Sequence, residues 1–173
     1  MCGVGYLCPP KKQRRLENPA QKVSELYGNK VRLRACGICV KEDKVLLINH
    51  ALYGSDFWSP PGGGLEFGES VTDCLKREFK EETGLRIKVG EMLFMHELIQ
   101  PPLHAIELFF NVLSWQGDLQ LGLDPEFSKS EQIIKEVRFL SFDEILALPD
   151  QSVHAIFRKT ASLEYLLKWR GVV

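Results

Sequence analysis

One stretch constrains the fold of this chain more than any other: a glycine-rich turn followed by an amphipathic segment, between Gly63 and Leu85. After the turn, apolar residues recur at helical spacing and define one inward arc: Val71, Cys74, Leu75 and Phe79. Gly84 stands where a helix C-terminus favours glycine. The opposite, solvated arc carries polar and charged residues: Thr72, Asp73, Lys76 and Lys80. The pattern predicts a helix that packs one face against the body of a globular domain.

The glutamates of this helix do not follow the division into two arcs. Glu78 and Glu82 project within the apolar arc, and Glu81 lies at its edge beside Arg77. Carboxylates turned toward a protein body are costly unless a cation neutralises them. Oxygen ligands at i, i+3 and i+4 suit Mg²⁺ or Mn²⁺, which also bind phosphate oxygens. A glutamate-rich solvated face is the alternative, but the solvated face of this helix lies elsewhere. The residues therefore predict a metal site that handles phosphates.

The stretch as a whole resembles the Nudix box, G-x5-E-x7-R-E-U-x-E-E-x-G-U. Every fixed position is present, and the one mild departure is Phe79, where an aliphatic residue is commoner. With the flanking strand pattern, the chain is similar to the Nudix family over roughly residues 31–148. The resemblance implies a three-layer α/β/α sandwich with a mixed β-sheet. The alternation of strand and helix patterns agrees with this α/β fold.

The resemblance also implies a chemistry and a set of site residues. The implied ligands of Mg²⁺ or Mn²⁺ are three side chains and one backbone carbonyl: Glu78, Glu81, Glu82 and Gly62. Arg77 would orient a carboxylate, and Glu69 would anchor the loop or assist a metal-bound water. The cation would offset the anionic charge of a pyrophosphate linkage and lower the pKa of the attacking water. The expected activity is hydrolysis of that linkage in a small-molecule nucleotide substrate.

The substrate is less well defined than the bond. Pro101, about sixteen residues beyond the box, resembles the pattern of ADP-ribose pyrophosphatases and slightly favours an ADP-ribose or nucleotide-sugar substrate. A proline there also arises for turn reasons alone. The alternative within the family is a (deoxy)nucleoside triphosphate pyrophosphohydrolase. A non-catalytic nucleotide sensor would be expected to carry a degraded box, and an interaction module would need a partner surface that the sequence does not reveal.

Strand patterns flank the box on both sides. Val31–Val40 and Val45–Asn49 predict a β-hairpin, followed by a loop over His50–Asp56. Phe57 and Trp58 then lead into the glycines, where they either stack on a base or pack the loop.

Beyond the box helix, Arg86–Leu98 and His104–Leu113 predict two further strands. In the second, Glu107 lies on the face with Phe109, which suits either a pocket wall near a metal or a solvated sheet edge. His104 faces the other way, so His104 and Glu107 are not a metal pair. The four histidines are expected to be surface or hydrogen-bonded structural residues: His50, His96, His104 and His154.

The connection Trp115–Lys135 is long, and loops of this length are frequently lids or binding elements. In Nudix enzymes a glutamate outside the box, often on such a loop, can serve as base or extra ligand. Besides the loop's Asp124, the sequence leaves four glutamates open for this role: Glu107, Glu126, Glu131 and Glu136. Glu136–Leu140 predicts a last strand, followed by a Ser141-capped helix over Phe142–Leu148 and a C-terminal helix over Val153–Trp169.

Length, charge and cysteine content indicate the number of domains and the class of protein. The 173 residues predict a single Nudix domain over 31–173, preceded by an appendage over 1–30. A net charge of −1 argues against sequence-independent nucleic-acid binding, and no apolar run is long enough to span a membrane. Five cysteines suggest reduced thiols in the cytoplasm. Zinc binding by Cys2, Cys8, Cys36 and Cys39 is disfavoured because the last two point to opposite faces of a strand. The family resemblance also allows a homodimer.

Overall fold

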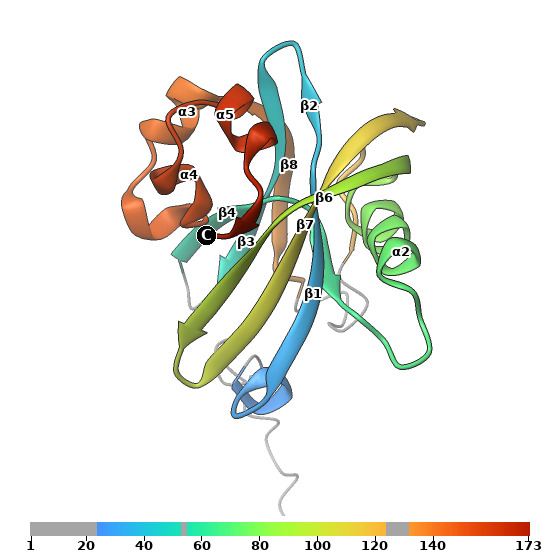
Figure 1. Cartoon of the computed structure of the whole chain (residues 1–173), viewed down its shortest axis with the longest axis vertical. Helices are drawn as coiled ribbons and strands as arrows, with labels where there is room; N and C mark the ends of the chain where they lie inside the picture. The colour runs from blue at the N-terminus through green and yellow to red at the C-terminus, as the bar shows by residue number, and fades with distance from the viewer. Residues whose placement is uncertain (1–23, 53–54, 124–131) are drawn as a thin grey trace, which may run out of the picture.

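The computed structural model describes residues 24–52, 55–123 and 132–173 of the chain (Figure 1). Its strands form two sheets, of which the first is mixed in strand direction and the second is antiparallel. The first sheet has five strands, in the order β5 (Gly62–Gly64), β1 (Val31–Ile38), β7 (Leu103–Gln116), β6 (Arg86–Gln100) and β9 (Gly171–Val172). The second contains β2 (Val40–Lys41), β3 (Lys44–Leu52), β4 (Ser55–Ser59) and β8 (Ile134–Ser141). In the first sheet β1 and β7 are parallel, whereas β6 and β7 form a long antiparallel hairpin.

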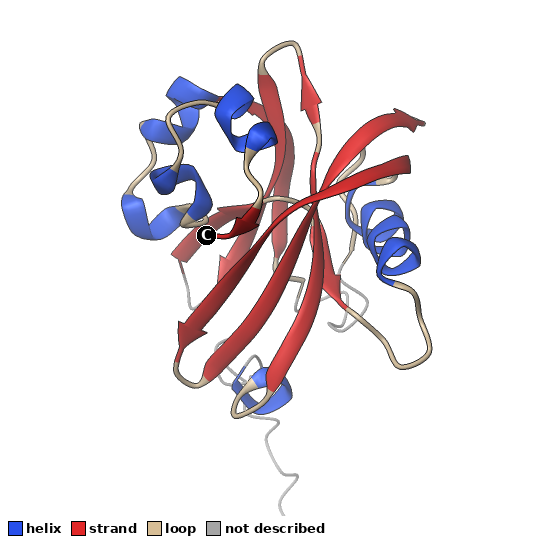
Figure 2. Ribbon diagram, in the orientation of Figure 1, coloured by secondary structure: helices blue, strands red, loops and turns tan. Residues whose placement is uncertain are grey.

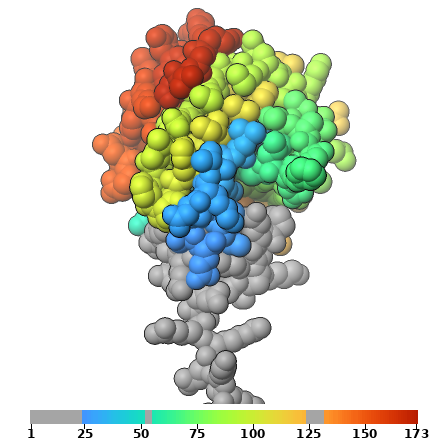
Figure 3. Space-filling model, turned by 60° about the horizontal axis from the view of Figure 1, so that its bottom comes forward, coloured from blue at the N-terminus to red at the C-terminus, as the bar shows by residue number. Residues whose placement is uncertain are grey.

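Helices cover the sheets on two sides (Figure 2). The box helix α2 (Val71–Thr83) lies on one side. The C-terminal helical segment lies on the other, with α3 (Phe142–Leu146), η1 (Asp150–Ser152), α4 (Ile156–Lys159) and α5 (Leu163–Lys168). In the space-filling view of Figure 3 the strands separate the box segment, in green, from the C-terminal segment, in orange and red. The predicted three-layer sandwich with mixed strand directions is confirmed.

Each side of the sheets has its own hydrophobic core. The core under the C-terminal helices includes Phe94, Phe109 and Phe157, and the core under α2 includes Leu75 and Phe79. All five side chains are fully buried. The two cores hold the layers together from opposite faces, because alternate residues of a strand point to opposite faces of the sheet.

The predicted hairpin is only partly right. β2 and β3 do pair antiparallel, with Val40 opposite Val45. The expected strand Val31–Val40, however, divides at Cys39, and β1 joins the other sheet. Cys36 packs in the core under the C-terminal helices and Cys39 in the core under α2, which confirms that they face opposite ways. Cys2 and Cys8 lie outside the described residues.

The loop expected over His50–Asp56 is wrong. β3 continues to Leu52 and β4 begins at Ser55, with residues paired from Ile48 opposite Ser59 onward. The polar residues of this stretch favoured a loop in the sequence. In the structure Asn49 is buried, and its side-chain oxygen accepts a hydrogen bond from the Phe57 backbone at 3.2 Å.

The single C-terminal helix expected over Val153–Trp169 is also wrong. The chain forms two short helices instead, and Thr160 between them has extended backbone angles (φ −109°, ψ 151°). The Thr160 hydroxyl donates to the Ser162 carbonyl at 2.9 Å, and the Ser162 side chain caps α5. Hydroxyl side chains that bond nearby backbone in this way compete with the helix. The predicted cap of α3 by Ser141 is confirmed, and the Ser141 backbone N–H donates in return to the Glu144 carboxylate at 2.8 Å.

The remaining elements differ from the expectations mainly at their ends. β6 and β7 are longer than the predicted strands, and Pro101 and Pro102 form the turn between them. The predicted last strand corresponds to β8, but β9 follows it at the C-terminus. Of the N-terminal region, residues 24–27 are helical and Gly28 donates to the Ser24 carbonyl at 2.8 Å. The appendage boundary at residue 30 remains a prediction.

Candidate metal centre

Local signals at both ends define the helix that carries the candidate ligands. Ser70 caps the N-terminus by accepting from the Asp73 backbone at 3.1 Å, and Gly84 ends the helix with φ 74°. The apolar arc is buried through Cys74, Leu75 and Phe79. The arc expected to be solvated is exposed at all four positions. The helical phase predicted from the sequence is therefore confirmed.

The glutamates of α2 are turned toward the protein, as their phase indicated. Glu82 is 5% exposed, and its Oε2 accepts a hydrogen bond from the Gly62 backbone at 2.9 Å. The Glu78 side chain is 12% exposed, and the Glu81 side chain is 32% exposed. Burial raises the pKa of Glu78, although its hydrogen bond from Arg77 acts in the opposite direction.

Arg77 joins the box residues into one group. Its Nε and Nη2 donate to the two oxygens of Glu69, both at 3.0 Å. Its Nη1 donates to Glu78 Oε1 at 2.8 Å and to Glu81 Oε2 at 3.2 Å. A further hydrogen bond of 3.1 Å from Nη2 reaches the Gly64 carbonyl. The guanidinium thus fixes three carboxylates and the glycine turn relative to one another.

The glycine turn fits closely against these carboxylates. A Cβ atom at Gly63 would lie 2.2 Å from Glu78 Oε1, and a Cβ at Gly62 would lie 2.1 Å from the Ala35 carbonyl. Gly62 also has φ 148°, which side chains rarely permit. Its carbonyl accepts from Arg34 Nη2 at 3.0 Å, and a carbonyl oxygen has a second lone pair. The candidate donors on α2 and at Gly62 are all hard oxygens, which fits a divalent cation of the Mg²⁺ or Mn²⁺ type.

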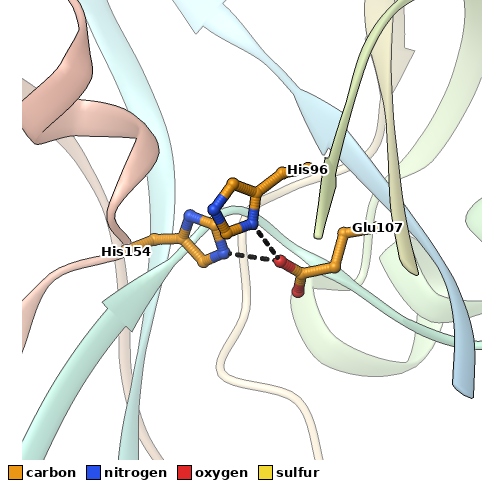
Figure 4. A group of neighbouring side chains, drawn as sticks. All are labelled: His96, Glu107 and His154. Atoms are coloured by element: carbon orange, nitrogen blue, oxygen red, sulfur yellow. Dashed lines mark hydrogen bonds and ion pairs between the residues drawn. The ribbon is translucent and has the colours of Figure 1, made fainter. Parts of the chain in front are cut away.

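Glu107 lies in a second polar group, on the sheet face opposite α2. Across the first sheet, Arg34 of β1 is in register with Glu107 of β7, and Glu107 with His96 of β6. Figure 4 shows the nitrogens of His96 and His154 directed at one carboxylate oxygen of Glu107, Oε2, at 3.0 and 2.8 Å. Arg34 Nε lies 3.4 Å from the other oxygen, Oε1. Glu107 is only 4% exposed, so it does not lie at a solvated sheet edge.

The charge state of Glu107 follows from these contacts. Burial alone would raise its pKa, but the hydrogen bonds from His154 and His96, together with the charge of Arg34, outweigh burial and lower the pKa. The carboxylate is therefore ionised at neutral pH inside the protein.

The aromatic pair before the box contributes to this second group. The backbone carbonyl of Trp58 accepts from the His154 backbone at 2.8 Å, and the Phe57 ring lies 6.3 Å from the His154 ring. Trp58 is 4% exposed and packs in the core, with the Arg138 guanidinium 5.2 Å from its ring centroid. Its burial favours the packing role over base stacking. Phe57 is half-buried and remains a candidate for stacking.

The sequence pattern does not predict the contacts of His96 and His154 with Glu107. The strand alternation could have placed His96 on the same face as Glu107 once the β6–β7 register was known. No local signal pointed to His154, because its segment was expected to be helical. His104 pairs with Glu97 at 3.0 Å and not with Glu107, as predicted. Partial burial and the charge of Arg34 lower the pKa of His50 to about 3.

The NUDIX domain model matches residues 31–160. The chain belongs to the Nudix family.

Relatives and solved structures agree with this assignment. The human diphosphoinositol polyphosphate phosphohydrolase 3-alpha is 33% identical over 110 residues, which cover 59% of this chain and 66% of that protein. The mouse diphosphoinositol polyphosphate phosphohydrolase 2 is 32% identical, with 60% of its length covered. The chain thus spans less than two thirds of the length of these curated relatives. The MutT Nudix hydrolase of Burkholderia pseudomallei has the same fold, with a TM-score of 0.62 at 19% identity over 79% of this chain and 98% of that one.

Besides Glu107, the candidates for an additional acidic residue are Glu136 and three residues of the long connection. Glu136 on β8 is exposed and forms an ion pair with Arg138 at 3.2 Å. Three acidic residues lie outside the described residues: Asp124, Glu126 and Glu131. Within the described part of the chain, no helix is both long and apolar enough to cross a membrane.

The described start of the long connection is bonded to the end of the Nudix helix. Backbone N–H groups of Gln120, Gly122 and Leu123 donate to the carbonyls of Thr83, Glu82 and Glu81, at 2.9, 2.9 and 3.3 Å. Carbonyls of the last helical turn have no partner within the helix, so these bonds satisfy them. The connection therefore contacts the backbone of two of the candidate ligands.

Proposed function

We propose that this Nudix protein hydrolyses a phosphoanhydride linkage with a divalent cation bound by its box glutamates. The observation that carries the proposal is the arrangement of three α2 carboxylates turned away from the solvated arc. Arg77 holds Glu78 and Glu81, and the Gly62 backbone N–H holds Glu82. With Glu69 the group contains four carboxylates, near the positive charges of Arg77 and Arg34, and a divalent cation would help to balance this negative charge. Mg²⁺ or Mn²⁺ fits the donor set.

Each residue of the site has a distinct proposed role. Glu78, Glu81 and Glu82 would hold the cation, with the Gly62 carbonyl as a further ligand. When bound, the cation supplies Lewis-acid stabilisation of the phosphate charge and lowers the pKa of a coordinated water. The Gly62 backbone N–H holds Glu82 in one orientation at 2.9 Å, so this carboxylate needs little reorganisation to bind. Glu81, the most exposed of the three side chains, is the one that water and substrate reach first.

Arg77 and Glu69 support these ligands. Because Arg77 donates to Glu78 and Glu81 through one nitrogen, it holds the two carboxylates close to each other against their mutual repulsion. The bidentate pair with Glu69 fixes the plane of the guanidinium. We assign both residues a supporting role in the site.

Three substrate classes are candidates, and an observation supports each of the first two. The proline at position 101 supports an ADP-ribose or nucleotide-sugar substrate; Pro101 lies in the β6–β7 turn, in a shallow hollow lined by residues 100–103. The names of the curated relatives support a diphosphoinositol polyphosphate. A (deoxy)nucleoside triphosphate is the third candidate. All three contain the anhydride that the site is proposed to cleave.

A substrate panel tests the proposal. Hydrolysis of ADP-ribose, a nucleotide sugar, a deoxynucleoside triphosphate and a diphosphoinositol polyphosphate would be measured with Mg²⁺ and with Mn²⁺. We expect metal-dependent turnover of at least one, and loss of that turnover on addition of EDTA. Tight nucleotide binding without turnover of any substrate would refute hydrolysis and favour the sensor.

The cellular location and the oligomeric state of the protein are also proposed. The cysteines at positions 36, 39 and 74 are free and buried, which supports a reducing compartment such as the cytoplasm. The homodimer remains a prediction from the family resemblance. Size-exclusion chromatography with light scattering would test it directly.

A further inference from the structure

A continuous chain of polar contacts joins the box to the buried Glu107 group. It begins at Glu82, whose Oε2 accepts from the Gly62 backbone N–H at 2.9 Å. The Gly62 carbonyl then accepts from Arg34 Nη2 at 3.0 Å. Arg34 Nε lies 3.4 Å from Glu107 Oε1, and Glu107 Oε2 accepts from two histidines. Three strands and the C-terminal segment thus converge on one backbone carbonyl beside the metal centre.

Arg34 depends on Glu107 for its position. Its side chain is 23% exposed, and its Nε is buried without a hydrogen bond to any described residue. The neighbouring carboxylate is therefore the main source of compensation for this buried part of the guanidinium. An arginine whose acidic partner is removed leaves an uncompensated buried charge and tends to move toward water. Movement of Arg34 would release the Gly62 carbonyl.

The two histidines hold the carboxylate in turn. Both donate to the same oxygen of Glu107, which leaves the other oxygen directed at Arg34. His154 Nδ1 accepts from the Ile156 backbone N–H at 3.4 Å, so the ring proton is on Nε2, the atom that faces Glu107. The backbone at the start of α4 therefore sets the tautomer that orients Glu107.

A metal ion at this second group is the competing explanation. The ligand atoms of His96, Glu107 and His154 lie within 4.8 Å of one another, and two imidazoles with one carboxylate form a zinc-type set. Metal at His154 Nε2 would require the proton on Nδ1, where it would face the N–H of Ile156. Histidine ligands normally donate that proton to an acceptor. The guanidinium 3.4 Å from Glu107 also opposes a second cation.

We propose that Glu107, His96 and His154 are positioning residues for the hydrolysis proposed above. They hold Arg34, and Arg34 fixes the orientation of the Gly62 peptide groups, one of which bonds Glu82 and the other of which offers the carbonyl. The inference rests on the proposed function. It assigns the Glu107 group to support of the metal centre and excludes Glu107 as the base, because both of its oxygens are already engaged.

Side chains that mimic one nitrogen of histidine test the donor role. The amide nitrogen of glutamine can replace Nε2, so His154→Gln keeps a donor toward Glu107 whereas His154→Leu does not. At position 96 the matched pair is His96→Asn, which replaces Nδ1, and His96→Leu. Outer-shell substitutions typically cost about 10-fold to 100-fold in metal affinity or activity. We expect the leucine variants to lose this amount in kcat/KM, mainly through kcat, and the amide variants to recover most of it.

A double-mutant cycle tests the route through Arg34. If Glu107 acts only by holding Arg34, then Glu107→Gln costs about 10-fold or more in the wild-type background but little in the Arg34→Met background. The cycle is measured twice, once on kcat/KM and once on the Mn²⁺ dissociation constant by electron paramagnetic resonance. Additive effects in both measurements would overturn the proposal. If Glu107→Gln does not fold, the comparison of His154→Leu with His154→Gln tests the proposal on its own.

Glu97→Gln is the matched control, because Glu97 and His104 form an exposed Glu–His pair at 3.0 Å on the same two strands. It should leave kcat/KM and Mn²⁺ affinity unchanged. Stoichiometric zinc in the purified protein that disappears in His154→Gln, or equal losses in His154→Gln and His154→Leu, would overturn the positioning role. The failure of the proposed function is distinct: the wild type would then hydrolyse no anhydride, while the Mn²⁺-binding cycle would still test the inference.

Discussion

Replacing Arg77 with lysine tests the central feature of the candidate metal centre, which is one guanidinium shared among three carboxylates. Arg77 makes five hydrogen bonds to oxygen: two to Glu69 and one each to Glu78, Glu81 and the Gly64 carbonyl. Lysine keeps the charge but has a single ammonium group without the planar fork. It can contact one end of the arrangement only. We therefore expect the charge to be retained and at least two of the five contacts to be lost.

The size of the effect follows from those contacts. Two hydrogen bonds to charged groups contribute about 3–6 kcal/mol when fully buried. The acceptor side chains are 12–32% exposed, so released carboxylates regain part of their hydration. We therefore expect Arg77→Lys to lower the free energy of unfolding by about 2–3 kcal/mol, because screening reduces the buried value. With a urea slope of about 2 kcal/mol per M, the midpoint should fall by about 1–1.5 M.

Urea unfolding in the presence of EDTA measures this effect without interference from bound metal. Arg170→Lys is the control, since Arg170 pairs with Glu91 at 2.9 Å on the surface and should change stability by less than about 0.5 kcal/mol. A loss below about 0.5 kcal/mol for Arg77→Lys would refute the shared role of the fork, because that is the range of ordinary surface substitutions.

Four further substitutions each address one contact. Glu82→Gln should abolish most turnover with circular dichroism and urea midpoint near those of the wild type; unchanged metal-dependent hydrolysis would contradict its role as a ligand. In Gly63→Ala the new Cβ would lie 2.2 Å from Glu78 Oε1, so we expect a loss of about 1–3 kcal/mol by urea unfolding and weaker Mn²⁺ binding. Because the pKa of Glu107 is below its ordinary value of 4.5, its stabilising contribution is present above that pH and is lost as the pH falls further. Urea titrations at pH 6 and pH 3.5 should therefore show a smaller acid loss for Glu107→Gln than for the wild type. Gly122→Ala places a Cβ 1.9 Å from a helix carbonyl and should lower the thermal midpoint, whereas an unchanged midpoint would show that the contact is easily relieved.

The box helix could be predicted because its information is local. The spacing of Cys74, Leu75 and Phe79 fixes the buried face, and Gly84 fixes the end. Once the face is known, the inward direction of Glu78 and Glu82 follows from the helical period alone. No contact with a distant segment is needed for that step.

The errors occurred where contacts other than helical or strand periodicity decide the structure. The pairing of β3 with β4 and β8 extends the strand through His50 and Ala51, although the polar residues Asn49 and His50 interrupt the apolar pattern. The break at Thr160 depends on its hydroxyl, which donates to the nearby Ser162 carbonyl and so competes with the helix. Local periodicity does not contain either contact.

The Glu107 group shows the same limit within the site. The side of the strand that carries Glu107 was predicted correctly, since Glu107 and Phe109 lie on one side of β7. Its partners required the register of β7 against both β1 and β6, together with a histidine 47 residues further along the chain. Strand register depends on turns and on sheet order, so the sequence alone left the role of this carboxylate open.

The bonds between residues 120–123 and the Nudix helix affect how freely this segment can change during evolution. All three are made by backbone N–H groups, so the identity of the side chains contributes nothing to them. Leu119, Leu121 and Leu123 are exposed and can be exchanged for polar residues without loosening the helix. Gly122 is the exception, because its Cβ would meet backbone. A segment bordering the candidate metal centre can therefore accumulate substitutions at most positions while the helix that carries the proposed ligands stays capped.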